Sequence, residues 1–131
     1  MRDNMAIAAE FERVLKTNDM QQMTKLTQDW ATDDFVQDWP QSGERMTKDG
    51  SMRLSASYDA MSGTSPKFTY KRMIGGGDVF VVEGTIDYGD GVPVSYVGVG
   101  ELRDGKIAKM TEWFANPFAA PEWRAAFVEK V

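Results

Sequence analysis

Residues 79–118 read VFVVEGTIDYGDGVPVSYVGVGELRDGKIAKMTEWFANPF, and this stretch decides the fold. It is rich in β-branched and aromatic residues, which favour strands, and Gly89-Asp90-Gly91 and Asp104-Gly105 divide it as tight turns would. A third turn signal, Gly75-Gly76-Gly77-Asp78, leads into it. Because strands joined by such short turns must be antiparallel neighbours, the pattern predicts a meander with strands near 67–74, 79–88, 93–103 and 106–115.

The strand predicted at residues 79–88 is apolar on both of its faces. Val79 and Val81 alternate with Phe80, Val82 and Ile86 along the chain. A strand of this kind needs cover on both sides of the sheet. The helices of a small domain can cover one side, so we infer that the other side meets a second copy of the chain in a homodimer.

The residues before the meander show the period of helices. The first apolar stripe predicts a helix that ends near Thr17, and it consists of Ile7, Phe11, Val14 and Leu15. The second stripe predicts a helix that Asn18-Asp19 caps, and it consists of Met20, Met23, Leu26 and Trp30. After a polar loop at residues 40–50, residues 51–61 predict a third helix, with Gly63 as its stop.

Aromatic residues gather around two prolines near the C-terminal end, in WFANPFAAPEW at residues 113–123. Asn116-Pro117 ends the last strand, and Pro121 is suited to begin a short helix with Trp123 and Phe127 on one face. Closure of the core or packing in a dimer is the predicted use of this stretch, and a lid over a pocket is the alternative.

Composition limits the possible functions. The chain has 131 residues, 42% of them hydrophobic and 27% charged, as expected of one globular domain. Its net charge of −5 and its scattered basic residues argue against a nucleic-acid partner. Its apolar runs are too short for a signal peptide or a membrane span, which predicts a cytoplasmic protein.

The chain contains no cysteine and no histidine. This excludes disulfides, thiolate nucleophiles, Ser-His and Cys-His mechanisms, and most transition-metal sites. Any chemistry then falls to carboxylates, Tyr, Lys and Arg, and we predict no cofactor and no metal.

One acid stands inside an apolar stretch, in DDFVQDWPQSGER at residues 33–45. Asp38 has Phe35, Val36 and Trp39 as near neighbours in sequence. A carboxylate in apolar surroundings either finds a partner or has its pKa raised. Asp38 is therefore either a functional acid or a strand-end residue that accepts a hydrogen bond from the turn at residues 41–43.

The order of helix, helix, short strand, helix and long meander resembles the cone-shaped fold of the SnoaL-like and nuclear-transport-factor-two-like superfamily. That superfamily includes polyketide cyclases, ketosteroid isomerases and limonene epoxide hydrolases. The resemblance spans nearly the whole chain and rests on DDFVQDWPQSGER (33–45), VVEGTIDYGDG (81–91) and GELRDGKIAKMTEWFANPF (100–118). It implies a single α+β domain over residues 1–131, with N-terminal helices packed on a curved antiparallel sheet around a pocket and dimers paired through the convex sheet face.

The resemblance also implies a set of pocket residues. Aligned on Asp104-Gly105-Lys106, it assigns to the pocket Phe80, Val82, Gly84, Ile86, Gly98, Gly100, Met110, Glu112 and Phe114. The further substrate-binding residues that we predict are Phe11 and Trp39 as wall residues and Tyr58 and Tyr96 as candidate hydrogen-bond donors. Asp38 falls where ketosteroid isomerases keep a general base, and Glu112 would face it as the acid. The alternative for Glu112 is an ion pair with a nearby Arg or Lys.

The departures from the family pattern narrow the activity. Where an isomerase-type oxyanion hole needs two donors, this chain has Phe11 and Gly98, so we do not expect steroid-type isomerisation. Histidine, common in the SnoaL-like cyclases, is missing. Gly98 and Gly100 either allow a strong bend of the strand or enlarge the pocket.

These inferences predict a protein that binds a small apolar or polycyclic molecule. If it is an enzyme, we expect cofactor-free acid/base catalysis by Asp38 and Glu112, of the isomerase or cyclase type. One alternative is a non-catalytic module for ligand binding or dimerisation. Another is an epoxide hydrolase, which requires an arginine close to the pocket acids.

Overall fold

The computed structural model describes residues 3–62 and 66–131, apart from the side chains of residues 58–62. The helices and strands follow the predicted order, with one additional strand. In chain order they are α1 (Asn4–Leu15), α2 (Met20–Trp30), β1 (Ala31–Trp39), β2 (Glu44–Thr47), α3 (Lys48–Ser62), β3 (Lys67–Gly76), β4 (Val79–Asp87), β5 (Pro93–Arg103), β6 (Lys106–Ala115) and the 3₁₀ helix η1 (Glu122–Phe127).

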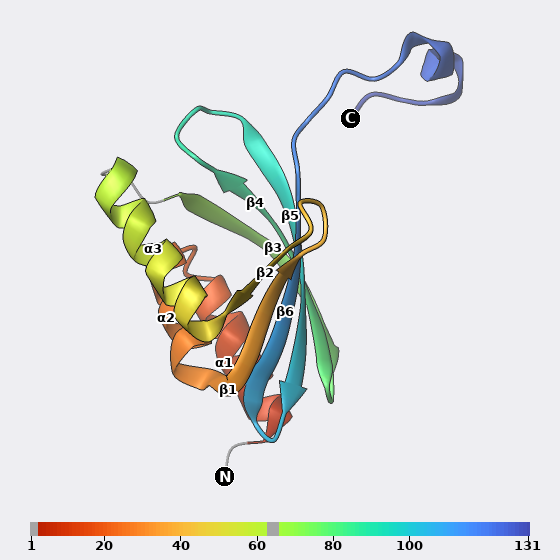
Figure 1. Ribbon diagram of the computed structural model, residues 1–131. Coiled ribbons are helices and arrows are strands. Elements are labelled where there is room, and N and C mark those ends of the chain that lie inside the picture. Colours follow the sequence, from red (N-terminus) through yellow and green to blue (C-terminus); the bar gives the residue numbers. More distant parts are fainter. Residues whose placement is uncertain (1–2, 63–65) are drawn as a thin grey trace.

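The strands form one open sheet in the order β2-β1-β6-β5-β4-β3. All neighbours are antiparallel except β1 and β6, which run parallel. The three helices cover one face of this sheet and leave the other face bare (Figure 1). The predicted α+β cone fold is therefore confirmed.

The turn signals set the register of the meander. Asp104 and Gly105 both have positive φ, 52° and 73°, as the tightest hairpin turns require. β5 and β6 consequently begin and end at the predicted residues, with Arg103 opposite Lys106.

One strand was not predicted. Residues 44–47, assigned to a polar loop, form the edge strand β2, which pairs only with β1. Three of its four residues are exposed, so its sequence carries no alternation of buried and exposed positions. Directly after it, Thr47 Oγ1 accepts a hydrogen bond from the Gly50 N–H, and α3 starts at Lys48 rather than at Ser51.

The core lies between α1, α2 and the concave face of the sheet. The predicted apolar stripe of α1 is buried, and the rings of Phe11 and Phe80 meet there with their centroids 4.9 Å apart. Asp19 caps α2 by accepting hydrogen bonds from the N–H groups of Gln21 and Gln22.

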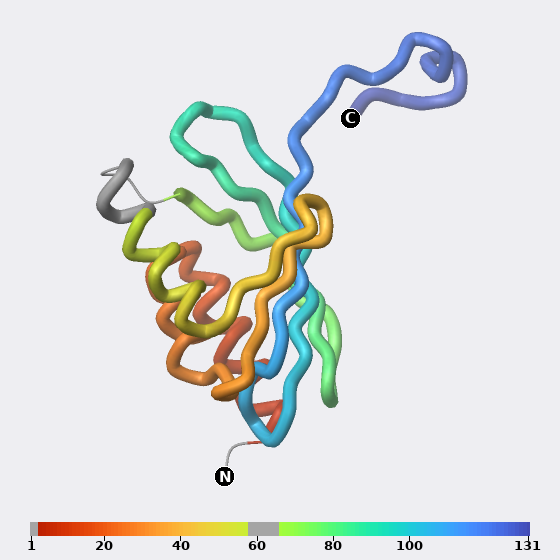
Figure 2. Tube along the Cα trace, in the orientation of Figure 1, coloured from red at the N-terminus to blue at the C-terminus, as the bar shows by residue number. Residues whose placement is uncertain are grey.

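The C-terminal arm, residues 116–131, leaves the end of β6 and extends away from the sheet (Figures 1 and 2). Its short helix η1 follows Pro121 as predicted. Phe118, Trp123 and Phe127 are 81%, 76% and 82% exposed. The prediction that this stretch closes the core is wrong for Phe118 and Trp123, because neither residue reaches the body of the domain within this chain.

Candidate functional site

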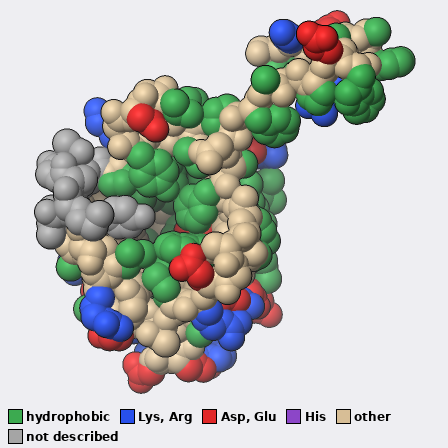
Figure 3. Space-filling view, turned by 45° about the horizontal axis from the view of Figure 1, so that its top comes forward, with side chains coloured by type: hydrophobic (Ala, Val, Ile, Leu, Met, Phe, Trp, Pro, Cys, Tyr) green, Lys and Arg blue, Asp and Glu red, His purple; other side chains and the backbone are tan. Residues whose placement is uncertain are grey.

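A cavity of about 690 Å³ lies between the helices and the concave face of the sheet. Apolar side chains form most of its wall, and Figure 3 shows hydrophobic side chains gathered on the face between the helices and the sheet. A cavity of this size is large enough to enclose most of a small organic molecule.

Most of the residues predicted to bind a substrate line this cavity. They are Phe11, Trp39, Val82, Tyr96, Met110 and Phe114. Phe80 lies beneath the wall instead, with none of its surface exposed. Tyr58 belongs to α3, but its side chain lies outside the described residues.

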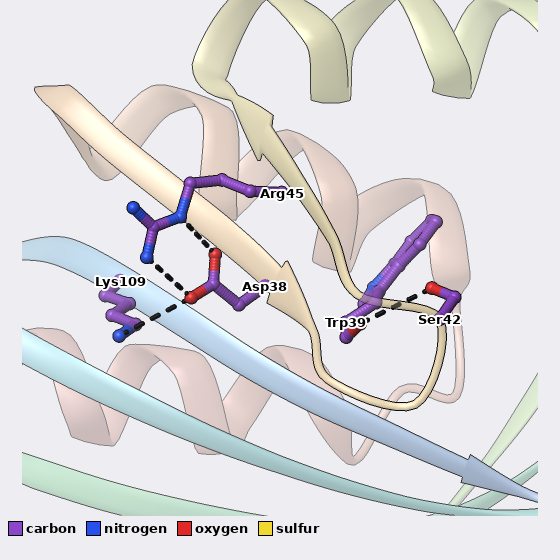
Figure 4. A network of polar contacts seen from close by, with 5 residues as sticks. All are labelled: Asp38, Trp39, Ser42, Arg45 and Lys109. Atoms are coloured by element: carbon purple, nitrogen blue, oxygen red, sulfur yellow. Dashed lines mark hydrogen bonds and ion pairs between the residues drawn. The ribbon is translucent and has the colours of Figure 1, made fainter.

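Asp38 does not line the cavity, which corrects its predicted placement. Side chains alternate along β1, so Gln37 and Trp39 reach the cavity and Asp38 points to the other face of the sheet. There it accepts hydrogen bonds from Arg45 Nε and Nη2 at 2.6 and 2.8 Å, and its Oδ2 lies 3.6 Å from Lys109 Nζ (Figure 4).

The surroundings of Asp38 are those of a structural ion pair. The Arg45 guanidinium, opposite Asp38 on β2, holds the pKa of this carboxyl below its usual range, whereas an apolar pocket would raise it. The alternative hydrogen bond from the 41–43 turn is not seen either. The N–H groups of Ser42 and Gly43 bond to the Trp39 carbonyl oxygen instead.

Glu112 places a carboxylate on the cavity wall. Gln37 Nε2 and Trp39 Nε1 donate to its Oε1, the latter at 3.0 Å, and the Tyr96 hydroxyl donates to its Oε2. Within residues 3–62 and 66–131, no Lys or Arg forms an ion pair with Glu112, so the predicted ion pair is not observed.

The two aromatic donors to this carboxylate, Trp39 and Tyr96, belong to a larger cluster of aromatic rings. The Phe114 ring lies 5.8 Å from that of Trp39 and 5.5 Å from that of Tyr96, and the Phe68 ring lies 5.7 Å from Tyr96. Burial and the neighbouring Glu112 raise the pKa of the Tyr96 phenol well above its ordinary value. Tyr96 therefore keeps its proton and donates a hydrogen bond to Glu112.

Gly98 and Gly100 do not enlarge the cavity. A Cβ atom on Gly98 would lie 2.4 Å from the Tyr96 hydroxyl oxygen, and one on Gly100 would lie 2.2 Å from Phe80 Cζ. Aromatic rings thus fill the space that the missing side chains leave. Gly98 was predicted to bind the substrate directly. Instead, its missing side chain lets the Tyr96 ring lie along β5 and reach Glu112.

Gln37 is the functional side chain that sequence reasoning missed. Its neighbours Asp38 and Trp39 drew attention, yet strand alternation places Gln37 on the same face as Trp39.

The other charged residues of the cavity wall, in the described part of the chain, are Lys25 and Asp29 of α2, which pair at 2.6 Å and are both exposed. No three potential ligands among His, Cys, Asp and Glu come together as a metal site in that same part of the chain.

The fold and site together define a cone-shaped α+β domain with an open, mostly apolar cavity. Residues 8–110 match the SnoaL-like domain family, and the chain belongs to this family. No curated protein sequence matches it significantly. Among the described residues, no helix is long and apolar enough to cross a membrane.

Solved structures of similar proteins agree with this assignment. An NTF-2-like protein of unknown function from Burkholderia xenovorans is 30% identical, with 98% of each chain covered and a TM-score of 0.73. A presumed ketosteroid isomerase from Kribbella flavida is 20% identical over 98% of this chain and 89% of its own, with a TM-score of 0.73. An LEH-like epoxide hydrolase from M. tuberculosis is 19% identical over 84% of each chain, with a TM-score of 0.60. The last two likenesses show the fold alone.

Proposed function

We propose that this protein binds a small apolar or polycyclic molecule in the cavity, with Glu112 as its polar anchor. The observation that carries the proposal is the carboxylate of Glu112, held by three uncharged donors on the wall of a mostly apolar cavity of about 690 Å³. Binding sites for small molecules combine an apolar lining with a few fixed polar groups in this way.

Proton transfer by Glu112 is a second candidate. The Tyr96 hydroxyl donates to Glu112 Oε2 inside the cavity, and such a carboxylate–phenol pair can take up and return a proton without a cofactor. The two-carboxylate mechanism with Asp38 as base has no support, because Asp38 faces away from the cavity. Isomerase or cyclase chemistry would therefore have to use Glu112 for the proton transfer.

Epoxide hydrolysis is not proposed. It requires an arginine near the pocket acid, and no arginine of the described residues lines the cavity. The basic side chain on the wall, Lys25, already pairs with Asp29.

We also propose a homodimer that forms through the convex face of the sheet. Ile74, Val79, Val97 and Trp113 are 53%, 43%, 38% and 38% exposed in the single chain, and no helix covers the face on which Val79, Val97 and Trp113 lie (Figure 1). The C-terminal arm adds three exposed aromatic side chains, for which a second copy of the chain is the proposed partner. A cytoplasmic location stays a prediction from the sequence.

A ligand screen tests the proposed function. Polycyclic ketones, polyketides and terpenoids would be tested for a rise in melting temperature of the wild type, of Glu112→Gln and of Asp38→Asn. A ligand at 100 times its Kd stabilises the folded state by about 2.7 kcal/mol. We expect hits to stabilise the wild type and Asp38→Asn alike, and Glu112→Gln less.

The same hits decide between binding and catalysis. Each would be incubated with the wild type and with Glu112→Gln, and the products would be analysed by chromatography and mass spectrometry. An isomer or cyclised product that forms only with the wild type would favour proton transfer by Glu112. If no compound stabilises the protein, or if Glu112→Gln responds fully, Glu112 is not the anchor of a binding site.

A further inference from the structure

The charge of Glu112 is not compensated inside the cavity. Its three partners, Gln37, Trp39 and Tyr96, are uncharged donors. The other charged residues on the described part of the wall, Lys25 and Asp29, pair with each other and cancel. A ligand that enters displaces the water near this carboxylate, and burying an anion without a counter-charge is costly. The cavity therefore favours a ligand that brings a positive charge.

The hydrogen bonds of Glu112 limit the ligand further. An ionised carboxylate has about four lone-pair positions, and three of them are occupied by the donors already described. Trp39 and Tyr96 each have a single polar proton, and both protons point to Glu112. One acceptor position remains, which an N–H group of a ligand can fill.

The rings beside the carboxylate suit the apolar part of a ligand. Trp39, Tyr96 and Phe114 form one cluster of aromatic contacts that includes two donors to Glu112, and all three line the cavity. Trp39 and Tyr96 turn their N–H and O–H edges toward Glu112, so the carboxylate and not a ring face places the ammonium group. The same rings give the apolar part of a ligand a surface to pack against.

We propose that the ligand is a protonated amine carried on an apolar frame, with its ammonium group hydrogen-bonded to Glu112. This inference rests on the proposed function, because it names the class of molecule that the same cavity takes. The amine is recognised by its charge and its N–H donor, and the apolar frame by the remaining wall.

Two matched series of probes test the charge preference. One comprises 1-aminoadamantane, 1-adamantanol and adamantane-1-carboxylate; the other comprises 4-phenylbutylamine, 4-phenylbutanol and 4-phenylbutanoate. Isothermal titration calorimetry at neutral pH should find the amine bound about tenfold or more tightly than the alcohol of the same frame, and the carboxylate weakest. The NMR signal of the Trp39 indole N–H, assigned with Trp39→Phe, should shift when the amine binds.

Two variants test the role of Glu112. In Glu112→Gln we expect the amine and the alcohol to bind with affinities within about twofold of each other, because the charge is gone. Asp38→Asn is the matched control: it removes the same charge from the opposite face of the sheet and should keep the preference for the amine. If Glu112→Gln does not fold, the order of the three wild-type affinities decides the question alone.

The outcomes separate this inference from the proposed function. An alcohol that binds the wild type as tightly as the amine, or an amine preference that survives in Glu112→Gln, would overturn the inference and leave ligand binding in place. Lack of binding by every member of both series would overturn the inference, and the proposed function would fall with it only if the ligand screen also found no hit.

Discussion

At Gly98 the missing side chain decides how Tyr96 and Glu112 meet. The Tyr96 ring lies along its own strand, over the position where any other residue would place a Cβ atom. Its hydroxyl thereby reaches Glu112 on the neighbouring strand β6, where Gly98 and Glu112 are paired. The carboxylate keeps a fixed orientation because one glycine leaves room for the phenol.

Gly98→Ala should therefore damage the site and the stability together. The new methyl group would overlap the Tyr96 hydroxyl, and relieving such an overlap in a packed interior costs about 1–3 kcal/mol. Urea denaturation should show a free energy of unfolding lower by that amount, with weaker binding of the ligands found in the screen. Gly76→Ala is the control, because a Cβ there has no atom within 4 Å. A Gly98→Ala variant as stable as the wild type would contradict this account of Gly98.

At the scale of elements, β1 holds the site and was the hardest strand to interpret from sequence. The turn signals alone predict β3 to β6 closely, because hairpin pairing is local. β1 instead pairs with β6 in parallel, and its Gln37 meets Glu112 across 75 residues of sequence. No local pattern encodes that contact. The family resemblance assigned the concave face of the meander but placed Asp38 in the pocket. The residues that lie there are its neighbours in sequence, Gln37 and Trp39.

Asp38 joins three strands on the opposite face. It lies on β1, directly across from Arg45 on β2 and beside Lys109 on β6. Because the folded-state pKa of Asp38 is lowered, its pairing stabilises the fold above the pKa of the unfolded chain. This contribution is lost as the pH falls through the folded-state value.

The pH dependence of stability tests this role of Asp38. Asp38→Asn should be less stable than the wild type near neutral pH, and the difference should shrink below about pH 4, as both proteins come to carry an uncharged side chain. Urea denaturation between pH 3 and 7 measures it, at low salt. In an Arg45→Gln background, Asp38→Asn should have a smaller effect; an undiminished effect would mean that Arg45 is not the principal partner.

At the scale of the whole molecule, the two faces of the sheet have different surroundings. The concave face is covered by helices and lines the cavity, whereas the convex face carries exposed apolar residues from several strands. Val97 lies near the middle of that face, between Glu83 on β4 and Trp113 on β6. A two-fold dimer formed there would bury the face twice and leave both cavities open to ligands.

Val97→Lys should weaken this dimer without unfolding the chain. Val97 is 38% exposed in the single chain, so a lysine can reach water in the monomer, but in a two-fold interface two lysines would be buried together. Sedimentation velocity should show a dimer for the wild type and mainly monomer for Val97→Lys, with unchanged circular dichroism. Met5→Lys is the control, because Met5 is 72% exposed and belongs to α1, a helix that covers the concave face of the sheet. Removal of residues 117–131 tests the C-terminal arm separately. A truncated chain that still dimerises would assign the interface to the sheet alone. A wild type that stays monomeric at high concentration would contradict the dimer.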